Sequence, residues 1–166
     1  VIGVPRDSDL PVLQKQDGSG PLWGPEDEWE AVTAYRQTDG AKHAIFALGA
    51  PAYLGGHAAE ALNGKGVATD VYVVNGLPIA EGVLSDLVGK YEGVVTIEDG
   101  KIGTPETGLR GFAALVGTAA SVQGVAHAHV GITDPRIAPS VGMEETWAHF
   151  GITAEAVVEA VETING

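Results

Sequence analysis

EGVVTIEDGKIGTPETGLRGFAALV, residues 92–116, joins a short apolar strand to an apolar helix through an acidic and glycine-rich link. The run Val94–Ile97 predicts a buried strand, and the pair Glu98-Asp99 follows it directly. A helix is expected over Leu109–Ala120. In open α/β sheets the ligand sites lie at the carboxyl ends of the strands. The stretch therefore has the position of a functional site.

Alternating strands and helices extend outward from this stretch over most of the chain. Near-continuous apolar strands of this kind are typical of a parallel sheet that is covered on both faces. We therefore predict an α/β fold, a three-layer α/β/α domain with a mostly parallel five-stranded sheet. The predicted strands are Ala31–Tyr35, His43–Leu48, Asp70–Val74, Val94–Ile97 and Gly124–Val130, and the predicted helices are Leu54–Leu62, Glu81–Val88, Leu109–Ala120 and one opening at Thr153.

The size and composition indicate one globular domain. The chain has 166 residues, of which 45% are hydrophobic and 19% charged, and this balance is typical of a folded protein rather than a disordered one. It contains no cysteine, which excludes disulfides, thiolate metal sites and cysteine nucleophiles. We expect a cytoplasmic protein.

The charge balance is strongly acidic, with a formal net charge of -13. An acidic surface repels phosphate backbones and anionic lipids, which disfavours a nucleic-acid or membrane-surface partner. No apolar run approaches the roughly 18 residues of a transmembrane helix, and no signal peptide is recognisable.

The N-terminal segment, residues 1–27, is rich in Pro, Gly and Asp and is expected to form an irregular arm before a domain over residues 28–166. Trp23 lies within the arm and Trp29 lies at its edge. Disordered tails rarely carry tryptophan, so we expect part of the arm to pack on the domain or on a partner.

The order of segments resembles the C-terminal domain of transketolase-like, thiamine-diphosphate-dependent enzymes. The resemblance covers roughly residues 28–164. Two segments depart from the family pattern: Lys101–Thr107 lengthens the link after the acidic pair, and the region near Ile132–Gly142 looks closer to deoxyxylulose-phosphate synthases. The resemblance is carried by Ala44–Gly49, His57–Leu62, Gly66–Val71, Asn75–Ile79, Lys90–Asp99, Gly108–Val116 and Phe150–Val158.

This resemblance implies a sheet of order 1-3-2-4-5 with the first strand antiparallel. It also implies that the chemistry lies elsewhere, because the family binds thiamine diphosphate and Mg²⁺ through a Gly-Asp-Gly motif that this sequence lacks. The chain is then expected to be the C-terminal section of a ketol-transferring enzyme, serving dimerisation and active-site support without binding the cofactor. Its expected partners are the N-terminal thiamine-binding domains or subunits and further copies of itself.

Two other interpretations remain open. The chain could be a stand-alone α/β module, regulatory or binding a small anion, or a subunit of a related 2-oxo-acid dehydrogenase or deoxyxylulose-phosphate synthase. An α/β enzyme of another family is disfavoured, because the sequence contains no phosphate-binding loop and no Gly-x-Ser-x-Gly motif.

The acidic pair Glu98-Asp99 has two interpretations. One is a polar contact to a neighbouring subunit or domain, a role in which Trp23 and Trp29 are also candidates. The other is a carboxylate that caps nearby backbone N–H groups.

Arg110 is a lone cation near Gly108 and Gly111. Together with their backbone N–H groups it could hold a phosphate or carboxylate. The alternative is an ion pair with Glu106 or Glu98.

His127 and His129 alternate along a predicted strand and should therefore point to the same face. Two histidines rarely suffice for a metal site, and a third ligand would have to come from Asp134 or elsewhere. We expect no metal and favour histidines that are satisfied by hydrogen bonds.

Overall fold

The computed structural model describes residues 11–80, 82–104, 106–134 and 137–166. Within these residues, strands and helices alternate as the sequence predicts. None of the helices described combines the length and the apolar character needed to cross a lipid bilayer. The elements are β1 (Val32–Arg36), β2 (His43–Leu48), α1 (Ala52–Gly64), β3 (Thr69–Val74), α2 (Val83–Val88), β4 (Gly93–Lys101), α3 (Gly111–Gln123), β5 (Ala126–Ile132), α4 (Met143–His149) and α5 (Ala154–Asn165).

The strands form a five-stranded sheet of order β1-β3-β2-β4-β5. β1 pairs with β3 in antiparallel orientation, while β2, β3, β4 and β5 are parallel to one another. The predicted fold class, strand order and orientation are confirmed. Because the chain crosses from β3 over β2 to β4, the connections reverse direction between β2 and β4, and ligand crevices of open α/β sheets lie at such a point.

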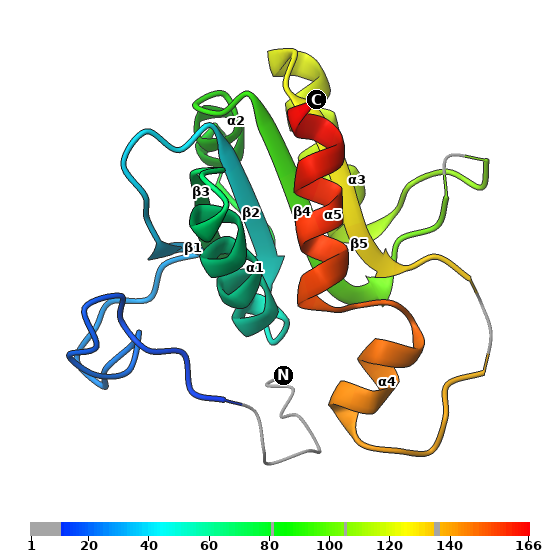
Figure 1. The fold of residues 1–166 in the computed structure, drawn as a ribbon, viewed down its shortest axis with the longest axis horizontal. Helices are drawn as coiled ribbons and strands as arrows, with labels where there is room; N and C mark the ends of the chain where they lie inside the picture. The colour runs from blue at the N-terminus through cyan, green and yellow to red at the C-terminus, as the bar shows by residue number, and fades with distance from the viewer. Residues whose placement is uncertain (1–10, 81, 105, 135–136) are drawn as a thin grey trace.

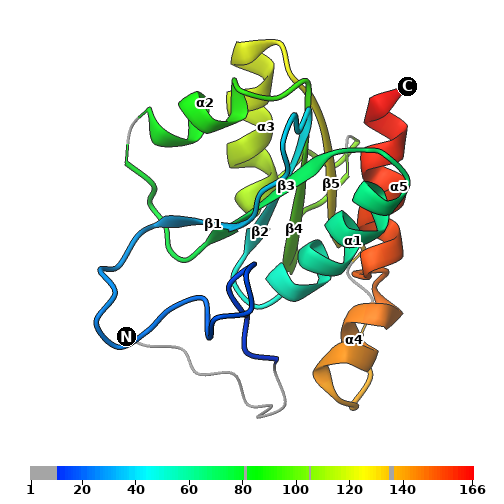
Figure 2. The same ribbon diagram turned by 60° about the vertical axis from the view of Figure 1, so that its left-hand side comes forward.

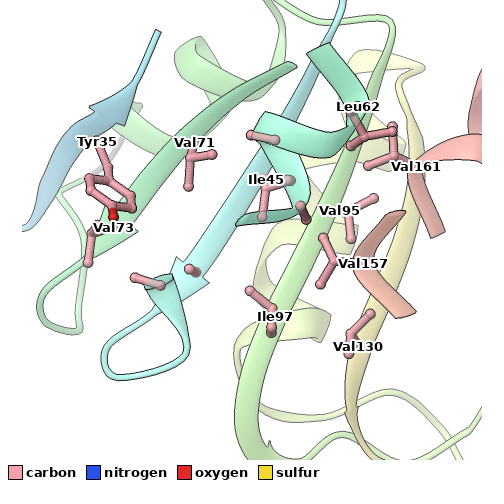
Figure 3. Close-up of a cluster of buried hydrophobic side chains, with 14 of the residues drawn as sticks. Tyr35, Ile45, Leu62, Val71, Val73, Val95, Ile97, Val130, Val157 and Val161 are labelled. Atoms are coloured by element: carbon pink, nitrogen blue, oxygen red, sulfur yellow. The ribbon is translucent and has the colours of Figure 1, made fainter. Parts of the chain in front are cut away.

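The helices cover both faces of the sheet (Figures 1 and 2). α1 and α5 pack side by side on one face, and α2 and α3 pack on the other. Successive strand residues point to opposite faces, so β2 sends Ile45 into the first interface and Phe46 into the second. Figure 3 shows the first cluster, where Ile45, Val95 and Val157 lie between the sheet and the helices.

Several predicted boundaries are wrong by a few residues. α1 begins at Ala52 and runs to Gly64, so it extends beyond both ends of the predicted range Leu54–Leu62. α3 begins at Gly111 and runs to Gln123, so Arg110 is the N-cap residue instead of part of the first turn. The predicted start of the last helix at Thr153 is confirmed, since Thr153 is the N-cap of α5 and its Oγ1 accepts a hydrogen bond from the Ala156 N–H at 3.2 Å.

The described part of the arm, residues 11–27, contains no helix or strand element and only an isolated bridge between Gln14 and Pro21. It is nevertheless packed on the domain. Leu13 and Leu22 contact the core cluster under α1, and the Gln16 side chain donates to the Gln37 carbonyl at 2.8 Å. The sequence Thr133-Asp134-Pro135 is typical of a turn, and its last residue lies outside the described residues.

Candidate functional site at the junction of β4 and α3

The acidic pair lies inside β4 and not beyond its end, because the strand continues to Lys101. The regular pairing with β5 is interrupted after Ile97 and resumes where Lys101 lies opposite Ile132. Glu98 is only 4% exposed, whereas Asp99 is exposed. The prediction of a strand that ends at Ile97 is wrong, because it assumed that the carboxylate of Glu98 would be exposed to solvent.

Glu98 caps the N-terminus of α3. Its Oε1 accepts a hydrogen bond from the Ala113 N–H at 2.7 Å, while the N-cap residue Arg110 provides no side-chain cap. Gly100 and Gly111 leave room for this carboxylate, since a Cβ at either position would come within 2.7 and 2.8 Å of Glu98 Oε2. A negative charge at a helix N-terminus is favourable. The capping interpretation is therefore confirmed for Glu98.

The described residues of the link between β4 and α3, 102–104 and 106–110, belong to a loop that is closed at its base. At its base the Arg110 N–H donates to the Ile102 carbonyl at 2.9 Å, and the Ile102 N–H donates to the Ile132 carbonyl at 2.8 Å. Ile102 is fully buried. Gly103 has φ +74°, and a Cβ there would overlap the Gly108 carbonyl oxygen, so this position requires glycine.

The loop places Arg110 at the surface beside α3. Its guanidinium donates to the Thr107 carbonyl at 3.2 Å. The ion pairs found among the described residues do not include the expected contacts with Glu106 or Glu98. The arginine is thus free to face a ligand, but an anion at the start of α3 would lie close to the carboxylate of Glu98.

The histidines of β5 lie together, as their alternation predicts. The ring centroids of His127 and His129 are 5.8 Å apart, and His127 Nε2 lies 3.4 Å from Thr96 Oγ1. His127 packs against Gly117 of α3, where a Cβ would meet its Nδ1 at 2.9 Å. Burial, followed by the neighbouring His129, lowers the pKa of His127 to about 4. Both rings are therefore held as neutral side chains at neutral pH.

A buried polar network that was not predicted from the sequence lies near the amino-terminal ends of β3 and β4. The Tyr91 hydroxyl donates to Asp70 Oδ2 at 2.7 Å and lies 2.8 Å from the Tyr72 hydroxyl. The backbone N–H of Thr38 donates to Asp70 Oδ1 at 2.8 Å. Burial and these hydrogen bonds raise the pKa of Tyr91. The available signal was an aspartate inside an otherwise apolar strand. Both carboxylate oxygens of Asp70 accept hydrogen bonds from groups of the protein itself, so the role of the network is structural.

Trp23 of the arm and Trp29 at its edge have different surroundings. Trp23 donates its ring N–H to Thr33 Oγ1 at 3.3 Å and is 38% exposed. Trp29 is 71% exposed and lies over Gly76, where an added Cβ would come within 2.9 Å of the indole ring. Trp29 thus offers one face of a large aromatic ring to solvent.

The described residues offer no cluster of three or more His, Asp or Glu side chains that could hold a metal ion. The two most buried carboxylates are already used, Glu98 by the start of α3 and Asp70 by Tyr91 and Thr38. The carboxylates and histidines of the part of the chain that the structure describes therefore do not fit a magnesium–diphosphate site.

Neither a protein-family model nor a curated protein matches the sequence. Solved structures do match. A split-gene transketolase, described as an inactive beta4 tetramer, superposes with a TM-score of 0.69 at 22% identity, and the match covers 89% of this chain and 46% of that one. Transketolases from Campylobacter jejuni and Leishmania mexicana give TM-scores of 0.57 and 0.56 at 15% and 19% identity, with 87% and 81% of this chain covered.

The chain spans less than half of the split-gene transketolase chain and about a fifth of the two longer transketolases, 20% and 18%. At these identities the likeness concerns the fold. The order of the sheet, its antiparallel first strand and the flanking helices agree with that likeness. The chain therefore has the transketolase-like fold of one section of these enzymes.

Proposed function

We propose that the chain is the C-terminal section of a transketolase-like enzyme. In this role it serves dimerisation and supports an active site that other sections build. The complete enzyme transfers two-carbon ketol units between sugar phosphates in the cytoplasm. The partners are the thiamine-binding N-terminal sections, on the same chain or on a separate one, and further copies of this section.

The observation that carries the proposal is the superposition on the split-gene transketolase, which covers 89% of this chain but only 46% of that chain. Nearly the whole of this chain therefore corresponds in fold to slightly less than half of that chain, as expected for one section of such an enzyme. That protein is described as an inactive beta4 tetramer, so a chain of related fold assembles with itself in a state without activity. This description supports a non-catalytic, assembling role for the present chain.

The chemistry of the side chains supports the same division of labour. The sequence lacks the Gly-Asp-Gly motif, and the carboxylates at the candidate site do not fit a magnesium–diphosphate complex. In the proposed enzyme, thiamine diphosphate and Mg²⁺ belong to the partner sections. The exposed Asp99 and Trp29 are the side chains that we assign to contacts with those sections.

The test is a reconstitution. The chain is mixed with the thiamine-binding section encoded in the same genome, and ketol transfer from a ketose phosphate to an aldose phosphate is measured with thiamine diphosphate and Mg²⁺. We expect activity from the mixture and none from this chain alone. Activity of the isolated chain, or no binding and no change in activity on mixing, overturns the proposal. Turnover of a 2-oxo acid in place of a ketose donor reassigns the chain to a 2-oxo-acid dehydrogenase or deoxyxylulose-phosphate synthase.

A stand-alone module that binds a small anion is the second candidate, and the exposed Arg110 favours it. Gly108 and Gly111 would contribute backbone N–H groups beside the guanidinium. The carboxylate of Glu98 opposes it, since it already satisfies the Ala113 N–H. Binding of inorganic phosphate to the isolated chain, tested below, separates this candidate from the first.

A further inference from the structure

A groove runs between α1 and α5, which pack side by side on one face of the sheet (Figures 1 and 2). Two cavities of about 440 and 360 Å³ open there, the first between α1 and α5 and the second where both helices meet α4. They share His57, Ala154 and Glu155 in their walls and therefore form one continuous groove. The segments that build these walls, residues 53–65 and 143–162, are described without a gap.

The wall that α5 contributes is acidic. Glu155, Glu159 and Glu162 follow one another at intervals of about one turn along the helix and line the groove. Lys65 is the one Lys or Arg among the described residues of the walls, and Glu162 already holds its ammonium group at 2.7 Å. The ion pairs found in the described part of the chain do not include Glu155 or Glu159. The groove thus has a net negative charge.

The end of the groove beside α4 is aromatic. The ring of Tyr53 borders the cavity, 6.0 Å from the ring of the buried Trp147, measured between centroids. The Tyr53 hydroxyl donates to Oε1 of the exposed Glu144 at 2.8 Å. An aromatic face with a carboxylate beside it is the combination that attracts ammonium and guanidinium groups. This end of the groove is therefore suited to a cationic group.

The floor of the groove is apolar and is built from small side chains. Ala58, Ala61 and Val158 lie there, and they allow a second backbone to approach closely. Ala61, Glu155 and Glu159 are exposed, so the groove is open along its length. A small molecule is normally enclosed over most of its surface by its site, whereas an amphipathic helix needs only a groove of this kind. The shape therefore favours a segment of a protein.

The charge of the chain decides between the proteins that could lie in the groove. Each copy carries a formal net charge of -13. A second copy in this position would bring like charges together, and an acidic partner would be repelled in the same way. A basic partner is attracted, because its charge is complementary to that of the groove.

We propose that the groove between α1 and α5 binds a basic helical segment of a partner protein. Lys or Arg side chains one turn apart on that segment face Glu155 and Glu159, a further one enters the aromatic end at Tyr53, and small apolar residues lie on the floor. This inference goes beyond the proposed function, since the groove needs neither thiamine diphosphate nor the thiamine-binding section to bind such a segment.

The experiment measures binding of a fluorescent helical peptide to the full chain by anisotropy, at low and at moderate salt. The probe is an Ala- and Leu-based peptide of about 18 residues, long enough to form a helix, with Lys at intervals of one turn. We expect binding that weakens with salt. The same peptide with Glu in place of Lys should not bind. No binding of the Lys peptide at low salt overturns the proposal.

Matched variants distinguish the groove from a general attraction between opposite charges. Glu155→Gln combined with Glu159→Gln should raise the Kd of the Lys peptide at least about fivefold. Glu26→Gln combined with Glu28→Gln is the control, because it removes the same charge from exposed positions outside the groove, and it should change the Kd less than about twofold. Equal weakening by the two double variants overturns the proposal.

Two further measurements test the shape of the site and the size of its occupant. Ala61→Leu fills the floor without a change of charge and should weaken peptide binding at least about fivefold. A variant that melts like the wild type and binds the peptide equally well overturns the assigned groove. Spermidine, a small polyamine, should displace the peptide only at much higher concentration, because it covers a fraction of the groove. Displacement at equal concentration overturns the helical segment in favour of a small polyamine.

Discussion

Removing the carboxylate of Glu98 should destabilise the whole domain, although the residue lies at what looks like a ligand site. Glu98 is 4% exposed and satisfies the N–H of Ala113 at 2.7 Å. The loss of a capping group costs about 0.5–2 kcal/mol, and the loss of a partly buried negative charge near a helix N-terminus costs up to about 2 kcal/mol. Because the two effects overlap, we expect Glu98→Ala to lower the free energy of unfolding by about 1–3 kcal/mol. Glu98→Gln keeps an acceptor but loses the charge, and should cost about 1 kcal/mol.

The assay is urea unfolding followed by far-UV circular dichroism, and the order of the variants is the decisive result. At this chain length each kcal/mol lowers the melting temperature by roughly 2–4 °C, so a thermal melt provides an independent check. Glu106→Ala is the matched control, because Glu106 is an exposed carboxylate of the same junction. If Glu98→Ala unfolds within about 0.5 kcal/mol of the wild type, the reasoning that makes Glu98 a structural cap is wrong.

Three further predictions concern the buried polar groups and the anion candidate. Tyr91→Phe leaves Asp70 Oδ2 without its hydroxyl donor and should cost about 1–3 kcal/mol in chemical denaturation; Tyr53→Phe, which removes a more exposed hydroxyl, is the control and should cost less. The lowered pKa of His127, about 4, means that the unfolded chain binds the proton more readily. The contribution of neutral His127 to the free energy of unfolding should therefore be fully present above pH 6.5 and be lost towards pH 4, a fall of about 1–3 kcal/mol after allowance for partial exposure. His127→Gln should flatten the dependence of stability on pH in this range, and equal slopes for the variant and the wild type would contradict the prediction. Inorganic phosphate should leave the melting temperature unchanged if the chain is a supporting section, whereas a rise that disappears in Arg110→Gln would favour the anion-binding module.

Apolar periodicity predicted the layers of this protein well, because the strands are buried on both faces. His43–Leu48 is predicted to the residue, since five of its six residues are buried and glycine follows directly. The strand order and the antiparallel first strand came from the resemblance to a family, and local sequence does not contain them. The predicted helix ends were wrong where tertiary contacts override local preference. α1, for example, continues to Gly64 instead of ending at the predicted Leu62.

The candidate site was predicted in position but not in role. A carboxylate followed by glycines at a strand end is compatible with a ligand site and with a helix cap. Only the distance between Glu98 and the Ala113 N–H distinguishes the two. The network around Asp70 could not be predicted, because Tyr91 lies 21 residues away along the chain. The groove between α1 and α5 was equally hidden, since Tyr53 and Glu144 in its walls lie 91 residues apart along the chain.

The closed base of the loop 102–110 has a practical consequence for studying this protein. The hydrogen bond from the Arg110 N–H to the Ile102 carbonyl holds the two ends of the loop together, and Glu106 and Thr107 near its tip are exposed. A peptide tag inserted between these two residues adds only slowly growing loop entropy, and the hydrogen bonds that it interrupts are those between Thr104 and Thr107 at the surface. An affinity or fluorescent label at this point would leave both ends of the chain, the arm and α3 unaltered. Assembly could then be followed in living cells without fusing a reporter to either terminus.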